Sequence, residues 1–355
     1  MNIIAIDLFC GIGGITHGFV RQGIKVIAGY DNDPSCKYAY ETNNNARFIC
    51  TDIASIVPKD IANLFPKDSI RIIIGCAPCQ PYSTYSYKSK KDNDPRYKTL
   101  TYFSQIIEEV QPEIVSMENV PDLYKKNYPQ YVEFIHILKK CNYSIFEKII
   151  NCADYGVPQS RKRLVIVASK LGKFDLIPPT HKNNYITVRD TIAHLPTIKH
   201  GTSDKKDFIH KCSKLSPINL KRIKATPEGG GWKDWPKHLL LACHKKETGK
   251  TYSSVYGRMS WDNVAPTITT QSYRLGTGRF GHPEQNRAIS LREAALLQTF
   301  PNSYQFISPQ EHINFFNTGK HIGNAVPVKL AEVIAISIKK HLQKYSYPLQ
   351  NPFVL

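Results

Sequence analysis

The first 170 residues alternate between short apolar runs and amphipathic stretches, and this alternation limits the fold more than any other feature. Apolar runs of strand length cover residues 3–9, 25–30, 71–75, 113–117 and 163–168. Amphipathic stretches typical of surface helices cover 101–110 and 131–140. Strand–helix repetition predicts a parallel sheet with helices on both faces. We therefore expect a Rossmann-like, doubly wound α/β domain that binds its ligands where the strands end.

The hydrophobic periodicity fades after about residue 171. Residues 199–250 hold 13 lysines or arginines against 5 acids, and Trp232 and Trp235 lie inside this basic stretch. One interpretation is a solvated loop region, and the other is a small irregular domain that faces phosphates. Helical patterns return at 290–298 and 327–340. The sequence thus predicts three parts: an α/β domain (1–170), a basic insert (171–287) and a helical return that completes the first domain (288–355).

Composition restricts the compartment and the partner. The 47 basic and 29 acidic side chains give a net charge of +18, which favours a polyanionic partner. Nine cysteines without framework spacing indicate a reducing compartment and no disulfides. No unbroken apolar run approaches the roughly 18 residues that span a bilayer, and the first seven residues predict a strand rather than a signal peptide. We expect a cytoplasmic protein that does not contact a membrane.

A glycine turn follows the first apolar run. Gly11 and Gly13 allow close approach of a ligand and a sharp entry into a helix. Asp31 ends the second run, 20 residues after Gly11, where an acid can bind ribose hydroxyls. Asp52 follows a third short strand and suits an adenine edge. The pattern favours an adenosyl ligand without choosing the cofactor, since Thr16 breaks the full glycine motif and a nicotinamide dehydrogenase would look similar.

Cys79 follows the apolar run at 71–75 in the segment Gly75-Cys76-Ala77-Pro78-Cys79-Gln80-Pro81. It is open to three interpretations: a small buried filler, half of a zinc site or redox pair with Cys76, or a nucleophile. Zinc needs four ligands, and the sequence has no second Cys-x-x-Cys pair. Glu118 and Arg163 border two other predicted strands, so a thiol, an acid and a guanidinium would converge at one sheet edge.

These residues together resemble the cytosine-5 DNA methyltransferases. The ordered motifs are Asp7 to Gly14, Asp31, Thr51-Asp52, Pro78-Cys79-Gln80, Glu118-Asn119-Val120, Gln159-x-Arg161-x-Arg163, Arg292 to Pro301, and Gly323-Asn324-Ala325-Val326-Pro327. They span nearly the whole chain except the basic insert. The resemblance implies the methyltransferase fold, S-adenosylmethionine as methyl donor with S-adenosylhomocysteine as product, no metal, and double-stranded DNA as substrate.

The resemblance also implies catalytic roles. Cys79 would add to carbon 6 of cytosine and so activate carbon 5 toward methylation. Glu118 would contact ring nitrogen 3 and the exocyclic amine, and Arg163 would hold the base carbonyl. Arg161 would have a positioning role. The target cytosine would be flipped out of the duplex, and the polar stretch 83–98 would close over the DNA.

The cofactor contacts implied by the resemblance come from both ends of the chain. Phe9 would stack near adenine, with Gly11 and Gly13 approaching the methionine end. Asp31 would bind the ribose and Asp52 the adenine amine, although the family more usually has a glutamate in place of Asp31. Two further contacts are Pro78 and, at the carboxylate end of the cofactor, Asn324.

The basic insert matches the family's target-recognition region. Candidates for reading base edges are Arg258, Gln271, Arg274 and Arg279, near the threonine cluster at 267–270. The resemblance further implies a bacterial or phage restriction-modification enzyme. We expect a monomer that shares its site with a cognate restriction endonuclease without a stable complex.

The sequence disfavours three alternatives to this function. Methylation of tRNA cytosine keeps the fold, but that branch carries a Cys-Phe-Thr signature in its recognition region, and this chain has none. A catalytically inactive DNA-binding regulator would not need Cys79, Glu118 and Arg163 together. A nicotinamide dehydrogenase would give Cys79 and Glu118 no joint role.

Overall fold

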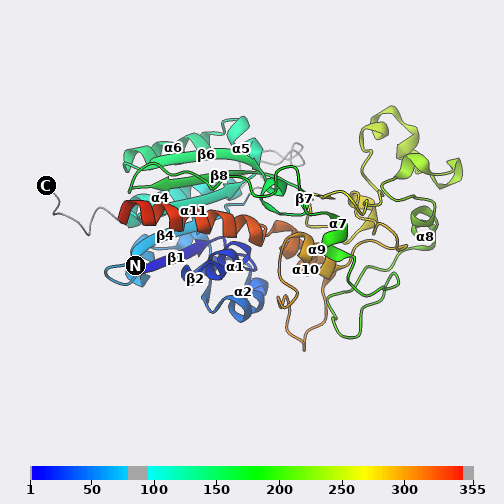
Figure 1. The fold of residues 1–355 in the computed structure, drawn as a ribbon, viewed down its shortest axis with the longest axis horizontal. Coiled ribbons are helices and arrows are strands. Elements are labelled where there is room, and N and C mark those ends of the chain that lie inside the picture. The colour runs from blue at the N-terminus through cyan, green and yellow to red at the C-terminus, as the bar shows by residue number, and fades with distance from the viewer. Residues whose placement is uncertain (1, 79–94, 347–355) are drawn as a thin grey trace. The chain divides into compact units, whose positions relative to one another are not determined.

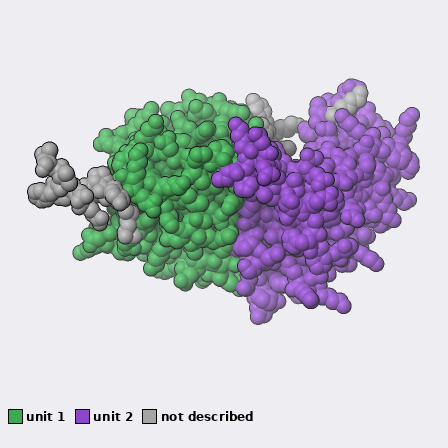
Figure 2. Space-filling view, viewed as in Figure 1, with its two compact units in different colours: residues 1–155, 162–179, 326–355 green, residues 156–161, 180–325 purple. Residues whose placement is uncertain are grey.

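The computed structural model describes residues 2–78 and 95–346. The chain forms two compact units (Figure 2). Unit 1 comprises residues 1–155, 162–179 and 326–355, and unit 2 comprises 156–161 and 180–325. The chain therefore leaves unit 1 twice and returns to it twice. Residues 288–325 belong to unit 2, whereas we expected them to belong with the first domain.

Unit 1 is built on a seven-stranded sheet in the order β3-β2-β1-β4-β5-β8-β6 (Figure 1). Its strands are β1 (Ile3–Leu8), β2 (Lys25–Asp31), β3 (Arg47–Cys50), β4 (Ile70–Gly75), β5 (Ile114–Asn119), β6 (Ser144–Asn151) and β8 (Lys162–Ser169). The pairs among the first five strands in the chain are all parallel. The predicted doubly wound α/β class is confirmed.

Helices cover both faces of this sheet. They are α1 (Gly14–Arg21), α2 (Lys37–Asn44), α3 (Pro58–Leu64), α4 (Lys98–Val110), α5 (Pro121–Lys125), α6 (Pro129–Lys140) and α11 (Val328–Ser346). Helix α1 packs on α11, whereas α4 packs on α3 and α6. Alternate residues of β1 (Ile4, Ile6 and Leu8) join the core that contains α4, and the residues between them are buried as well. Burial on both faces explains why five of the six residues of β1 are apolar, with Asp7 as the exception.

Two strands at one edge of the sheet differ from the sequence expectation. The run at 163–168 forms β8, which is antiparallel to its neighbours β5 and β6. Strand β6 was not predicted at all, because Glu147 and Lys148 interrupt its apolar pattern. β6 is an edge strand whose middle is exposed, so it needs no continuous apolar run.

Unit 2 has little regular structure. Its strands are β7 (Gln159–Ser160) and β9 (Ala265–Pro266), which pair in parallel, and its helices are α7 (Val188–Ile192), α8 (Pro217–Lys224), α9 (Leu291–Leu297) and α10 (Phe315–Asn324). Trp232 and Trp235 are buried in one small apolar cluster with Leu239. The two tryptophans of the basic stretch therefore form core rather than a surface that faces phosphates.

A buried ion pair between Arg287 and Glu293 lies in unit 2. Arg287 and Glu293 are each about 1% exposed, and two guanidinium nitrogens of Arg287 lie 2.7 Å from the two carboxylate oxygens of Glu293. The same carboxylate also accepts a hydrogen bond from the backbone N–H of Ser290, at the start of α9. Such a bidentate contact satisfies both buried charges.

One helical stretch, Phe315–Tyr345, is long and apolar enough to cross a membrane by length and composition alone. About three quarters of its most apolar window (72%) is buried inside the protein. A core helix passes the same test. The C-terminal part of this stretch lies in α11, which packs on α1. The stretch is therefore weak evidence for a membrane span.

A buried acid lies under the glycine turn of unit 1. Asp7 is fully buried near the end of β1, and burial raises its pKa to about 7. Thr16, the residue that breaks the glycine motif, donates its hydroxyl hydrogen to Asp7 Oδ2 at 2.7 Å. Among the residues that the structure describes, no group hydrogen-bonds to Asp7 Oδ1. The carboxyl group is thus held in an environment that favours its protonated form.

This environment predicts that wild-type stability depends on pH through Asp7 and that Asp7→Asn removes this dependence. The pKa of Asp7 is near 4 in the unfolded chain and about 7 in the folded one, so between these values the folded protein binds a proton that the unfolded chain does not. Wild-type stability should fall as pH rises through this range, by at most about 1.4 kcal/mol per pH unit from this group. The asparagine variant lacks this loss. Urea unfolding of both proteins should be measured at pH 5, 6, 7 and 8. The free energy of unfolding of the variant, relative to that of wild type, should increase up to about pH 7, and a constant difference would contradict the assignment.

Candidate active site

The turn between β1 and α1 requires an unusual backbone. Phe9, Gly11 and Gly13 all have positive φ angles, of 63°, 49° and 85°. A Cβ atom built on Gly11 would meet nothing within 4 Å, so open space borders the chain there. Glycine is needed for its conformation rather than for room. The half-buried ring of Phe9 makes an edge contact with Phe103, with the centroids 6.1 Å apart.

Two acids stand at the carboxyl ends of neighbouring strands beside this turn. Asp31 ends β2, and its carboxylate accepts hydrogen bonds from the backbone N–H groups of Gly11 (2.8 Å) and Asp33 (2.9 Å). Asp52 follows β3, is exposed, and accepts from the N–H of Ala54. A carboxylate at the end of β2 and the open space at Gly11 fit the ribose part of an adenosyl ligand, and the exposed carboxylate of Asp52 fits its adenine part.

The second group of site residues lies on β5 and β8. Glu118 faces Val165 across the antiparallel pair, so Arg163 is its diagonal neighbour on the same face. Arg163 Nε lies 2.8 Å from Glu118 Oε1, and the two side chains are 13% and 3% exposed. No described residue donates a well-directed hydrogen bond to this oxygen, although the charges are close. Glu118 therefore has a nearby positive charge and an acceptor position that a ligand can use.

Cys76 fixes the other oxygen of Glu118. Its thiol donates a hydrogen bond to Glu118 Oε2 at 3.0 Å between sulfur and oxygen. The next residue, Ala77, accepts a hydrogen bond from the side-chain amide of Asn119 at 3.1 Å. The segment after β4 is thus tied to the end of β5 at two consecutive residues. Sequence reasoning considered Cys76 only as a metal or redox partner of Cys79 and missed this contact.

Pro78, the last described residue before the gap, is half-buried. Cys79 and residues 83–94 of the polar stretch lie outside the described residues. The backbone that leads to Cys79 is nevertheless placed, because Cys76 and Ala77 both contact the end of β5. The predicted nucleophile follows directly in the chain after this anchored segment.

Two predicted site residues belong to unit 2. Arg161 is buried, and it donates to the backbone carbonyl oxygens of Ile268 (3.2 Å) and Ala325 (3.5 Å). Asn324 is exposed at the end of α10. Gln159 belongs to the same motif as Arg161. Its side-chain amide donates a hydrogen bond to the carbonyl oxygen of Leu297 and accepts one from the N–H of Ile268. Within unit 2, Arg161 and Gln159 thus hold the backbone around residue 268.

Arg258 also has a structural environment. It is buried and donates hydrogen bonds to four backbone carbonyl groups and to the side chain of Asn286. Burial lowers the pKa of its guanidinium to about 10. Arg258 therefore stabilises the interior of unit 2 and does not fit the base-reading role we expected. The sequence did not indicate that Arg258 is buried, because a buried arginine and a base-reading arginine can occur in the same sequence context.

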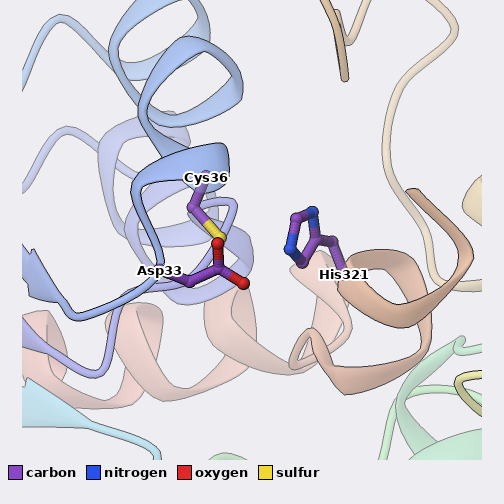
Figure 3. A group of neighbouring side chains, drawn as sticks. All are labelled: Asp33, Cys36 and His321. Atoms are coloured by element: carbon purple, nitrogen blue, oxygen red, sulfur yellow. The ribbon is translucent and has the colours of Figure 1, made fainter. Parts of the chain in front are cut away.

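Figure 3 shows Asp33, Cys36 and His321, three side chains that carry atoms of the types that bind metals. Asp33 and Cys36 belong to unit 1, at η1 (Pro34–Cys36), whereas His321 belongs to α10 of unit 2. Asp33 already accepts a hydrogen bond from the backbone N–H of Ser35 as the cap of η1. Neither unit contains all three residues, so they do not form a metal site within unit 1 or within unit 2.

Comparisons with known proteins identify the family. Residues 3–340 match the model of the family described as C-5 cytosine-specific DNA methylase. The chain is 52% identical over 340 residues, 95% of both chains, to Type II methylase M.HgiDII of Herpetosiphon aurantiacus. It is 28% identical to Type II methyltransferase M1.HphI of Haemophilus parahaemolyticus, covering 96% of this chain and 87% of that one.

Solved structures show the same fold. The methyltransferase EhMeth of Entamoeba histolytica aligns with a TM-score of 0.65 and 18% identity, over 96% of this chain and 99% of that one. A DNMT2 mutant of Spodoptera frugiperda aligns with a TM-score of 0.66 and 18% identity, over 95% and 99%. The resemblance drawn from the sequence motifs is confirmed by the family match and by the 52% identical relative. This chain belongs to the C-5 cytosine-specific DNA methylases, enzymes that use S-adenosylmethionine as methyl donor.

Proposed function

We propose that this enzyme is the modification methyltransferase of a restriction-modification system and that Cys79, Glu118 and Arg163 perform its chemistry on a flipped cytosine. The observation that carries the proposal is the buried Glu118–Arg163 pair, with the anchored segment Cys76-Ala77-Pro78 leading to Cys79. An acid, a guanidinium and a thiol are the groups that addition to a pyrimidine ring requires.

S-adenosylmethionine, when bound, supplies the methyl group as an electrophile. Phe9, Gly11, Gly13 and Asp31 would hold its adenosyl and methionine parts, together with Asp52, Pro78 and, from unit 2, Asn324. The open space beside Gly11, and the contact between the Gly11 N–H and the Asp31 carboxylate next to it, support this assignment. The aspartate at position 31 already accepts two backbone N–H groups, so we expect it to contact the ribose with one oxygen at a time.

The reaction would proceed through a covalent adduct. The Cys79 thiolate adds to carbon 6 of cytosine, and the displaced electron pair makes carbon 5 nucleophilic. Glu118 would hold the proton at ring nitrogen 3 and accept from the exocyclic amine, while Arg163 would bond to the carbonyl at carbon 2. Carbon 5 would then take the methyl group, with S-adenosylhomocysteine as the leaving group. Loss of the carbon 5 proton to water would return its electron pair to the ring and expel the Cys79 thiolate from carbon 6. Placing the base in the site requires flipping, which costs a few kcal/mol.

The relatives named as Type II methylases support a role in restriction-modification. Such an enzyme would methylate one cytosine in a fixed double-stranded sequence and protect it from an endonuclease that reads the same site. We propose that it acts as a monomer in the cytoplasm, on DNA without a metal ion and without a stable complex with the endonuclease. The net charge of +18 supports a DNA partner.

Trapping on modified DNA tests the nucleophile. A duplex with 5-fluorocytosine at the target has no proton to lose from carbon 5, so wild-type enzyme and S-adenosylmethionine should form a stable covalent complex, visible on a denaturing gel. Cys79→Ser should abolish the complex and still bind S-adenosylmethionine in calorimetry. Trapping by Cys79→Ser at the wild-type level would refute the assignment. Methyl transfer to tRNA and not to DNA would refute the substrate.

The Cys76–Glu118 contact predicts that Cys76 positions the carboxylate. Cys76→Ala removes the donor to Oε2, and a lost hydrogen bond to a charged group costs roughly 1.5–3 kcal/mol. We expect the single-turnover methylation rate to fall by about one order of magnitude. Cys76→Ser keeps a donor and should restore most of the rate. Equal rates in the alanine and serine variants would show that the thiol only fills space.

A further inference from the structure

The arginines of unit 2 differ in whether their guanidinium groups are already used. Unit 2 contains eight arginines. Seven of them donate to protein acceptors: Arg161, Arg189, Arg222, Arg258, Arg279, Arg287 and Arg292. Arg274 is exposed, and among the described residues its guanidinium contacts only the ring of Tyr273, with 5.5 Å between the guanidinium carbon and the centroid. Its five donors are therefore free for a ligand.

The backbone around Arg274 is held in place on both sides. The N–H of Arg274 donates to the carbonyl oxygen of Gln271 at 2.9 Å. The hydroxyl of Thr277 donates to the carbonyl oxygens of Gln271 (2.8 Å) and Arg274 (3.0 Å). The hydroxyl of Ser213 donates to the carbonyl oxygen of Tyr273 at 2.8 Å. An exposed, uncommitted side chain on an anchored turn is preorganised for recognition.

This turn borders a cavity of about 550 Å³ that lies wholly within unit 2. Arg274 lines it together with Lys214, Asn219, Tyr256, Tyr273 and Thr277. Tyr273 is only 4% exposed, and its hydroxyl has no hydrogen-bond partner among the described residues. The cavity therefore combines a free guanidinium, an exposed ammonium and a buried polar atom without a partner.

The donor geometry indicates the ligand. A guanidinium fork matches two acceptors side by side, and guanine presents such a pair, N7 and O6, in the major groove. We propose that Arg274 reads a guanine of the target sequence at this cavity. The proposal rests on the proposed function, since it takes specific double-stranded DNA as the substrate. Lys214, a point charge on a flexible stem at the same cavity, suits a phosphate, which fixes position without reading sequence.

Methylation profiles of variants test this assignment. Wild type, Arg274→Ala and Lys214→Ala each methylate a duplex library with randomised sequence, and bisulfite sequencing reads which cytosines are modified. Wild type should require a guanine at a fixed distance from the target cytosine. Arg274→Ala should lose roughly 10- to 100-fold of the discrimination at that one position and keep it elsewhere. Lys214→Ala should keep the full sequence preference and show weaker, less salt-dependent binding.

A base analogue separates base reading from phosphate contact. Replacing that guanine by 7-deazaguanine removes the N7 acceptor, so it should slow wild type and leave Arg274→Ala unchanged. If Arg274→Ala keeps the wild-type preference at every position, the proposal is overturned. Uniformly weaker methylation of all sequences would likewise overturn it and make Arg274 a phosphate contact. A wild-type enzyme that methylates no DNA would instead contradict the proposed function.

Discussion

The antiparallel pairing of β5 with β8 is the constraint on which the proposed catalytic site depends. It makes Arg163 the diagonal neighbour of Glu118 and brings the Arg163 Nε atom to 2.8 Å from the carboxylate. Because Glu118 is only 3% exposed, its charge needs this partner. The thiol of Cys76 then fixes the second oxygen, and the segment toward Cys79 follows that contact. A parallel β8 would have placed the motif at the opposite edge of the sheet.

Much of unit 1 could be predicted because both faces of its sheet are buried. The mostly apolar sequences of β1 and β4 follow directly from that burial. The glycine turn was predictable because positive φ angles at Gly11 and Gly13 favour one residue type. The direction of β8 and the existence of β6 were not, because strand direction leaves no trace in an apolar run and an exposed edge strand has no clear period.

Unit 2 shows what a letter pattern cannot separate. Arg258 and Arg274 are equivalent in sequence pattern. The guanidinium of Arg258 is buried among carbonyl groups, whereas that of Arg274 contacts only a tyrosine ring among the residues that the structure describes. Trp232 and Trp235 lie in a basic stretch and still form core. With little regular structure, unit 2 is stabilised by side chains bonded to backbone, and the difference between structure and recognition depends on tertiary contacts.

We propose that Glu118 and Arg163 act as one unit in catalysis. A double-mutant cycle tests it most directly, with single-turnover methylation rates for wild type, Glu118→Gln, Arg163→Met and the double variant. Residues that act together give non-additive losses. If Glu118 and Arg163 act together, the double variant should be about as slow as the slower single variant. Losses that multiply, as for two independent residues, would contradict it.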